Sequence, residues 1–233
     1  MIRYIDHQMM GRSRMGWLDS HFHFSFAEYR NPANMNFGVL RVLNDDLVEP
    51  GTGFDTHPHQ DFEIISYVVD GELTHADSMA NKQVLTRGQS QYMSAGTGIT
   101  HSEHNRGSSM LRLLQIWLFP DRKGYEPRYG DQRFRWEDRI NRWMPMASGD
   151  GDSRFPIQVH ADIHMYSAVL EPGKELICTA GPGRQAYLTL IEGEAEAGNV
   201  TLKSRDALEI VEETVTIRAG EAAHMLVIEM AKA

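Results

Sequence analysis

The sequence predicts an all-β protein made of two antiparallel β-barrels in tandem. Short runs of β-branched and aromatic residues, separated by Gly, Asn and Asp, dominate residues 37–119, whereas helical periodicity is scarce. Two short sequences of this region recur later in the chain at one constant interval. A chain of 233 residues is long enough to give each of two such units a core of its own.

The regular spacing of these runs is typical of a barrel or sandwich. Strands are expected at 38–43, 64–69, 83–85, 91–93 and 111–119. Turns are expected at Asn44-Asp45-Asp46, Asp70-Gly71 and Ala80-Asn81, where Gly, Asn and Asp interrupt the apolar runs.

An internal repeat predicts the second barrel. Val-Glu-Pro-Gly at 48–51 returns as Leu-Glu-Pro-Gly at 170–173, and Val-Asp-Gly-Glu at 69–72 returns as Ile-Glu-Gly-Glu at 191–194, both 122 residues later. At this offset His57, His59 and Glu63 fall on Thr179, Gly181 and Gln185. The second copy is therefore expected to be a scaffold without metal ligands.

The domain boundaries are placed by composition. Residues 1–120 are expected to form the N-terminal metal-binding barrel, 121–153 a linker rich in Arg, Asp and Gly, and 154–233 the degenerate C-terminal barrel. Basic and aromatic residues gather at 133–143, but acidic residues are interleaved among them. We therefore interpret that stretch as a solvated inter-domain helix or loop.

Composition excludes several function classes. The chain has 23 Lys and Arg against 32 Asp and Glu, a net charge of −9, which disfavours direct binding of nucleic acid. No segment approaches the roughly 20 apolar residues of a membrane-spanning helix, and the first residues do not resemble a signal peptide. Cys178 is the only cysteine, so no intramolecular disulfide can form, and a reducing cytoplasm is the expected location. The Cys178 side chain is expected to be a small buried hydrophobe. The sequence shows no apolar or charged patch that would predict a protein-docking surface.

Four residues predict a single metal ion. In His57-Pro58-His59 and in His101-Ser102-Glu103 the two potential ligands are two residues apart, so on a strand they point to one face. Three imidazoles and one carboxylate suit Fe, Mn, Ni, Cu or Zn, and a six-coordinate ion would keep two positions open. Open positions indicate chemistry rather than a structural role.

The spacing resembles that of the cupin superfamily. Gly51, then His57 and His59, then Glu63 reproduce its first motif, with Gly71 one residue later than usual. The second motif is looser: Gly88, Gly96, His101 and Asn105 stand in order, Ser94 occupies the usual proline position, and His101 lies further beyond Gly96 than expected.

The flanking sequence resembles the pirin family more closely. The residues that carry this resemblance are 16–26 (GWLDSHFHFSF), 40–46 (LRVLNDD), 57–63 (HPHQDFE), 93–105 (MSAGTGITHSEHN) and 115–117 (QIW). The resemblance implies a bicupin in which His57, His59, His101 and Glu103, and not Glu63, hold Fe in the N-terminal barrel. Some members oxidise the flavonol quercetin at its 2,3 position with O₂, whereas animal members are nuclear co-regulators that bind proteins.

Three functions follow as hypotheses. The first is an Fe(II) dioxygenase that takes an aromatic or enolic substrate and O₂, with Glu103 as general base toward the substrate hydroxyl. The alternative is an iron-containing redox-sensing or regulatory module that binds a protein without turnover. A third is a metal-dependent isomerase or hydrolase, for which zinc would be the native metal.

Several other residues compete for a role. Glu63 is expected to orient a ligand imidazole. His21 and His23 are expected to pack in the interior, and His104 to point away from the metal. His75 is expected either at the barrel mouth or in a surface turn.

Overall fold

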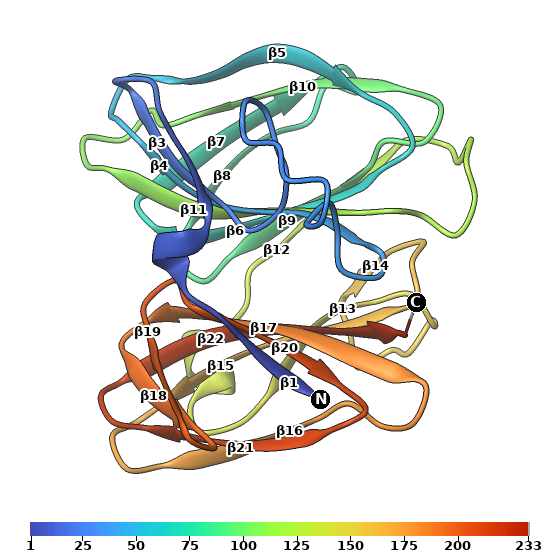
Figure 1. Cartoon of the computed structure of the whole chain (residues 1–233). Coiled ribbons are helices and arrows are strands. Elements are labelled where there is room, and N and C mark those ends of the chain that lie inside the picture. Colours follow the sequence, from blue (N-terminus) through green and yellow to red (C-terminus); the bar gives the residue numbers. More distant parts are fainter. Residues whose placement is uncertain (233) are drawn as a thin grey trace. The chain divides into compact units, whose positions relative to one another are not determined.

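The computed structural model describes residues 1–232, and regular structure in this part of the chain is almost entirely β-strand (Figure 1). The chain divides into two compact units. The N-terminal unit comprises 11–134 and 159–161, and the C-terminal unit comprises 1–10, 135–158 and 162–233. Each unit contains one seven-stranded and one four-stranded sheet, which confirms the predicted all-β fold with two units of one kind.

The strands of the N-terminal unit are β2 (Gly11–Arg14), β3 (Leu18–Phe22), β4 (Leu40–Val48), β5 (Gly53–His59), β6 (Glu63–Asp70), β7 (Glu72–Asp77), β8 (Lys82–Thr86), β9 (Ser90–Ser94), β10 (Ile99–His104), β11 (Leu111–Leu118) and β12 (Arg128–Gln132). The elements of the C-terminal unit are β1 (Ile2–Ile5), η1 (His7–Met9), η2 (Trp136–Arg139), β13 (Met144–Ser148), β14 (Ile157–Gln158), β15 (Ile163–Leu170), β16 (Glu175–Thr179), β17 (Arg184–Glu192), β18 (Glu194–Ala197), β19 (Val200–Lys203), β20 (Ala207–Val211), β21 (Thr214–Ala219) and β22 (Ala223–Ala231).

The two units share one strand order. The large sheet runs β12-β9-β6-β11-β4-β3-β2 in the N-terminal unit and β1-β20-β17-β22-β15-β13-β14 in the C-terminal unit. The small sheets run β5-β10-β7-β8 and β16-β21-β18-β19. Each strand of one unit therefore has a counterpart in the other, as the sequence repeat predicts.

The structure draws the boundaries differently from composition. The first residues form β1, which pairs with β20 near the other end of the sequence, so blue and orange strands lie side by side in Figure 1. The expected linker 121–153 contains β12, which pairs with β9, and β13, which pairs with β15. These pairings join segments far apart in sequence, and composition does not reveal them.

The turn expected at Asn44-Asp45-Asp46 is wrong, because these residues lie inside β4 and are buried. Polar partners make their burial possible. Arg112 binds Asp45 through two hydrogen bonds of 2.9 and 2.5 Å, and the Ser20 hydroxyl donates to Asp46 over 2.5 Å. Asn44 and Asp46, two residues apart, both face the cavity described below.

The apolar cores are separate in the two units. The N-terminal unit packs Leu18, Val48, Val68 and Leu113 in one cluster, and the C-terminal unit packs a larger cluster between its sheets. The basic-aromatic stretch is less solvated than expected, since the Arg139 side chain is fully buried, 4.7 Å from the Trp136 ring centroid. Within residues 1–232 no helix has the length and apolarity to cross a membrane.

Candidate metal centre

Strand β5 presents two imidazoles on one face. It is an edge strand of the small sheet, which tolerates Pro58 because no second neighbour needs its missing N–H. His57 and His59 flank this proline and are both half-buried, whereas Pro58 is exposed. The strand alternation that the sequence predicts is therefore present.

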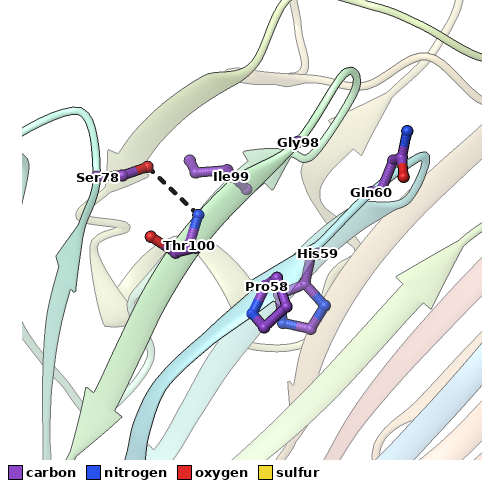
Figure 2. A pocket seen from close by; sticks show the side chains of 7 residues that line it. All are labelled: Pro58, His59, Gln60, Ser78, Gly98, Ile99 and Thr100. Atoms are coloured by element: carbon purple, nitrogen blue, oxygen red, sulfur yellow. Dashed lines mark hydrogen bonds between the residues drawn. The ribbon is translucent and has the colours of Figure 1, made fainter.

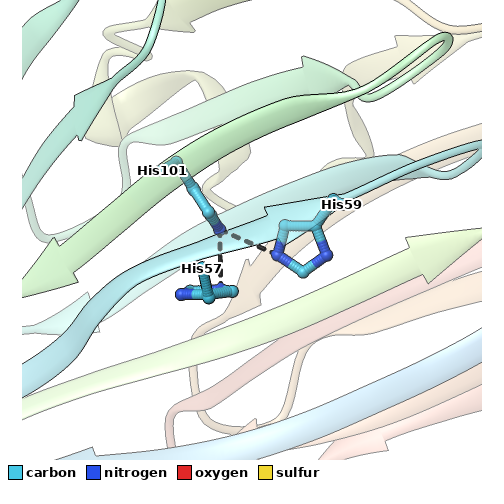
Figure 3. Close-up of side chains that lie close together, drawn as sticks. All are labelled: His57, His59 and His101. Atoms are coloured by element: carbon cyan, nitrogen blue, oxygen red, sulfur yellow. Dashed lines mark hydrogen bonds between the residues drawn. The ribbon is translucent and has the colours of Figure 1, made fainter.

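Strand β10 brings the third imidazole to the same point. His101 pairs with His57 in the ladder between the two strands. Its Nε2 lies 2.9 Å from Nε2 of His59 and 3.1 Å from Nε2 of His57, and Figure 3 shows the three rings converging. All three ligand nitrogens lie within 4.8 Å of one another.

The donor chemistry of this cluster fits a cation. Nδ1 of His57 lies 2.7 Å from the carbonyl oxygen of Asp55, so Nδ1 carries the proton and Nε2 keeps its lone pair. Burial, reinforced by the neighbouring imidazoles, lowers the pKa of both His59 and His101 to about 3, which keeps these rings neutral. The single N–H of His101 could satisfy only one of its two neighbours, whereas a metal ion accepts all three nitrogens.

The separations also fit ligands at adjacent corners of an octahedron. With metal–nitrogen bonds of about 2.1 Å, two ligands at right angles lie roughly 3 Å apart, and two tetrahedral ligands roughly 3.4 Å apart. The observed 2.9 and 3.1 Å match the first value. The three imidazoles could therefore hold one ion, which would keep further positions for a carboxylate, water or substrate if it were six-coordinate.

Glu103 is buried beside this cluster, but its oxygens lie outside the group of three nitrogens. A register shift in the β10–β5 ladder separates it from His101. Ser66 and Gln91 donate to Oε1 over 2.6 and 2.7 Å, and Gln115 donates to Oε2 over 2.6 Å. Three donors hold the carboxylate in place.

A cavity of about 220 Å³ adjoins the imidazoles. His57, His59 and Glu103 contribute to its lining, together with aromatic and polar side chains: Phe26, Phe54, Trp117, Asn44, Asp46 and Gln115. Trp117 meets His59 edge-on, with ring centroids 4.8 Å apart. Burial, together with the charges of Asp45 and Glu103 and against the Ser20 hydrogen bond, raises the pKa of Asp46 to about 7. The cavity thus has aromatic walls and a polar end.

A shallower hollow of about 460 Å³ lies beside His59 on the small sheet (Figure 2). It is lined by the last residues of β5, by the first residues of β10, by the loop residues next to them and by Ser78. The Ser78 Oγ accepts a hydrogen bond from the Thr100 amide over 3.3 Å. His59 therefore contacts both the cavity and this open hollow.

Glu63 orients an imidazole, but not that of a cluster histidine. Its Oε1 accepts from the Ser94 hydroxyl over 2.6 Å and lies 3.2 Å from Nδ1 of His160, while the His160 amide donates to Oε2 over 3.2 Å. The His160 ring also stacks on Tyr125, with centroids 3.6 Å apart. Glu63 therefore attaches 159–161 to the N-terminal unit.

The remaining histidines take other positions. His75 is fully buried, against both expectations for it, and its ring lies 5.5 Å from that of His101 and stacks on Tyr129. His104 points to Asp55, 3.2 Å away, as expected from strand parity. His21 and His23 are buried and lie outside the three-histidine group.

The residues missed from the sequence line the cavity or hold the Glu103 carboxylate, and they share one property. Asn44, Asp46, Gln91 and Gln115 are polar residues inside strands, where local composition gives no reason to single them out. Alternation could have found Gln115, because it lies two residues from Trp117 on a strand that is otherwise largely apolar.

Comparison with known proteins gives matches over most of the chain. The family model named Pirin matches residues 5–118, and the model named Quercetinase C-terminal cupin domain matches residues 146–230. A pirin-like protein of Caulobacter vibrioides is 40% identical over 223 residues, 95% of this chain and 96% of that one. Quercetin 2,3-dioxygenase of Escherichia coli K12 is 38% identical over 222 residues, 94% of each.

Solved structures agree with this fold. The crystal structure of the bacterial pirin YhhW of Escherichia coli in complex with nickel(II) superposes with a TM-score of 0.93 at 36% identity and full coverage of both chains. A further crystal structure of YhhW gives a TM-score of 0.94, covering 100% of this chain and 99% of that one. Both units accordingly have the cupin fold.

Proposed function

Because this chain belongs to the pirin family, we propose that it is a dioxygenase that cleaves a flavonol such as quercetin with O₂ at one Fe ion. The observation that carries this proposal is the convergence of three imidazoles beside an aromatic-walled cavity that Glu103 also lines. The name of the Escherichia coli relative supplies quercetin as the first substrate to test.

We assign the metal to His57, His59, His101 and Glu103. The bound ion supplies a redox-active Lewis acid that O₂ and an enolic substrate can share. Among Fe, Mn, Ni, Cu and Zn we choose iron, the metal that the family resemblance implies. Zinc is disfavoured because it cannot take part in redox steps. His57 is oriented by the Asp55 carbonyl, which fixes the tautomer that offers Nε2.

Glu103 has a second proposed role as general base. Its carboxylate lines the cavity, and Ser66, Gln91 and Gln115 occupy three of its roughly four acceptor positions. The position left on Oε2 would hold the ion or accept the proton of a substrate hydroxyl. Rigid placement of this acceptor reduces the reorganisation needed during the reaction.

The cavity walls support our choice of a flat aromatic ring as the substrate. Phe26, Phe54 and Trp117 offer apolar faces that exclude water, while Asn44 and Asp46 offer hydrogen-bonding groups at the polar end. Its volume of about 220 Å³ lies below the roughly 300–1,000 Å³ of sites that enclose drug-sized ligands. We infer that the reacting ring of the flavonol enters and that the rest of the molecule extends toward the mouth.

The test is O₂ consumption, quercetin absorbance and carbon monoxide release by iron-loaded protein. We expect turnover by the iron-loaded wild type and only background autoxidation by metal-free protein and by His59→Ala. His104→Ala is the matched control, since it removes a histidine of the same strand pair that faces Asp55 instead of the cluster. Equal quercetin decay in all samples would refute the enzyme and favour an iron-containing binding module.

Glu103→Gln separates the two roles of this residue. The variant keeps the size of the side chain but removes its negative charge and replaces one of its two acceptor oxygens with an NH₂ donor. We expect weaker iron binding and a kcat lowered by about 10²–10⁴-fold at full iron occupancy. Unchanged turnover of a proven substrate at full occupancy would show that the proton goes elsewhere.

A further inference from the structure

The C-terminal unit contains a cavity of its own, of about 300 Å³. It is lined by Trp143, Tyr166, Cys178, Thr179, Val227 and Glu229. These residues lie on or beside β15, β16 and β22, the counterparts of β4, β5 and β11 that line the catalytic cavity. The ladders make the match residue by residue, because Val227 pairs with Tyr166 as Gln115 pairs with Asn44.

The metal donors have been replaced at the matching positions. Thr179 stands where the repeat offset places His57, and Thr214 is its ladder partner, as His101 is the partner of His57. The Thr214 hydroxyl donates to that of Thr179 over 3.1 Å. Two neutral hydroxyls bonded to each other thus replace two imidazoles, while the cavity next to them remains open.

We propose that this cavity binds a phenol, one hydroxylated aromatic ring, without a metal. Its aromatic walls are held before any ligand arrives. The Trp143 indole donates to the Ile177 carbonyl over 2.8 Å, and the Tyr166 ring meets Phe155 edge-on with centroids 5.2 Å apart. Walls fixed in advance reduce the entropy lost on binding, and a flat ring can pack against their faces.

The polar end of the cavity favours a neutral hydroxyl donor over an anion. Glu229 is held by Arg184, whose Nε and second guanidinium nitrogen lie 2.5 and 2.7 Å from its two oxygens, and by His164 at 3.1 Å. A carboxylate has about four acceptor positions, so these contacts leave room for a phenolic O–H. Burial, and then the Glu229 charge, raise the pKa of the Cys178 thiol to about 12, which shows that a negative charge in this cavity is disfavoured.

The chain supplies a specific reporter, because Cys178 is its only cysteine and lines the cavity. The experiment measures the rate at which methyl methanethiosulfonate modifies Cys178 in the metal-loaded protein, by mass spectrometry, with added 4-fluorophenol or fluorobenzene. At a ligand concentration about ten times Kd, occupancy should slow the reaction about tenfold. We expect protection by 4-fluorophenol and much weaker protection by fluorobenzene, which lacks the hydroxyl.

Two phenylalanine variants test the location. Val227→Phe fills the cavity and should abolish protection. Ile177→Phe adds the same ring on the neighbouring, exposed position of the Cys178 strand and should keep it. If circular dichroism shows that Val227→Phe does not fold, Thr179→Trp at the exposed rim serves instead, because it blocks entry without altering the core.

Three outcomes would overturn the proposal: no protection of wild-type Cys178 up to the solubility limit of 4-fluorophenol, equal protection by fluorobenzene, or protection that persists in the blocked variant. The thiol reports on the C-terminal unit alone. Its result is therefore independent of whether the N-terminal unit cleaves quercetin.

Discussion

His164 lies between two carboxylates of the C-terminal unit, with Nε2 2.9 Å from Asp150 and Nδ1 3.1 Å from Glu229. Burial alone would lower its pKa, but the hydrogen bonds to Asp150 and Glu229 outweigh burial and raise the pKa above the ordinary value of 6.5. Because the folded pKa exceeds the unfolded one, the stabilisation is complete below about pH 6.5 and is lost as the pH rises through the folded pKa.

We therefore expect His164→Gln to lower the free energy of unfolding by up to about 1 kcal/mol near pH 5.5 and by clearly less near pH 9. Urea unfolding of the variant and the wild type at the two pH values measures this difference. A loss of the same size at both values would mean that His164 contributes by packing rather than by charge.

At the residue scale the convergence of the three histidines could be predicted and much of the cavity could not. His57 and His59 are two residues apart in sequence, and strand parity alone places them on one face. The local sequence around Asn44 and Asp46 is typical of a turn. Asp46 is buried with a hydrogen bond from Ser20, and both residues line the cavity, but neither feature is visible in that local sequence. Glu103 remains a predicted ligand. Hydrogen bonds hold its carboxylate beside the cluster, and the sequence spacing alone cannot predict that position.

At the scale of elements, β1 and β12 play matching parts. Each is the outermost strand of a large sheet, β12 next to β9 and β1 next to β20. Besides its backbone pairing with β20 and the hydrogen bonds from Arg3 to Glu209, strand β1 is fastened through Asp206, which is fully buried and accepts from the Tyr4 hydroxyl over 2.9 Å and from the amide of the following His7 over 2.9 Å. Neither strand shows a clear apolar alternation, which is why composition assigned one to a linker and gave the other no partner.

Asp206→Ala should leave these donors without a partner, and we expect the C-terminal unit to lose about 2–3 kcal/mol of unfolding free energy. Asp6→Ala serves as the control, because Asp6 is a solvent-accessible acid whose side chain accepts from the Gln8 amide and lies 3.6 Å from Nδ1 of His7, and it should cost less than about 1 kcal/mol. Thermal unfolding and limited proteolysis near the first residues report the loss. Equal stability of the two variants would show that β1 is held by its backbone pairing alone.

At the scale of the whole molecule, the repeat predicted two units of one kind, and the matched strand orders confirm this. The repeat also predicted an unequal chemistry, since the histidine positions of the first copy fall on residues such as Thr179 in the second. The sequence could not reveal that the second copy keeps a cavity, because side chains from three separate strands and from Trp143 define its volume.

We expect about one transition-metal ion per chain, and we expect His57→Ala and His101→Ala to lose it without unfolding. Each unit has its own apolar core, so the fold does not depend on the cation as that of a zinc finger does. Elemental analysis and circular dichroism measure the two quantities. A content near two ions per chain would contradict the reading of the C-terminal unit, and unfolding of the metal-free protein would contradict the independence of fold and metal.

The attachment of His160 to Glu63 has a consequence for the modularity of the chain. Residues 159–161 belong to the N-terminal unit although the segments on both sides of them belong to the C-terminal unit. Conversely, residues 1–10 belong to the C-terminal unit although they precede the N-terminal unit in the sequence. No single cut in the sequence can release either unit intact. A fragment ending at 120 would lack β12 and leave the Glu63 carboxylate without His160, and a fragment beginning at 121 would lack β1. We therefore expect each unit to fold only when both are expressed as one continuous chain.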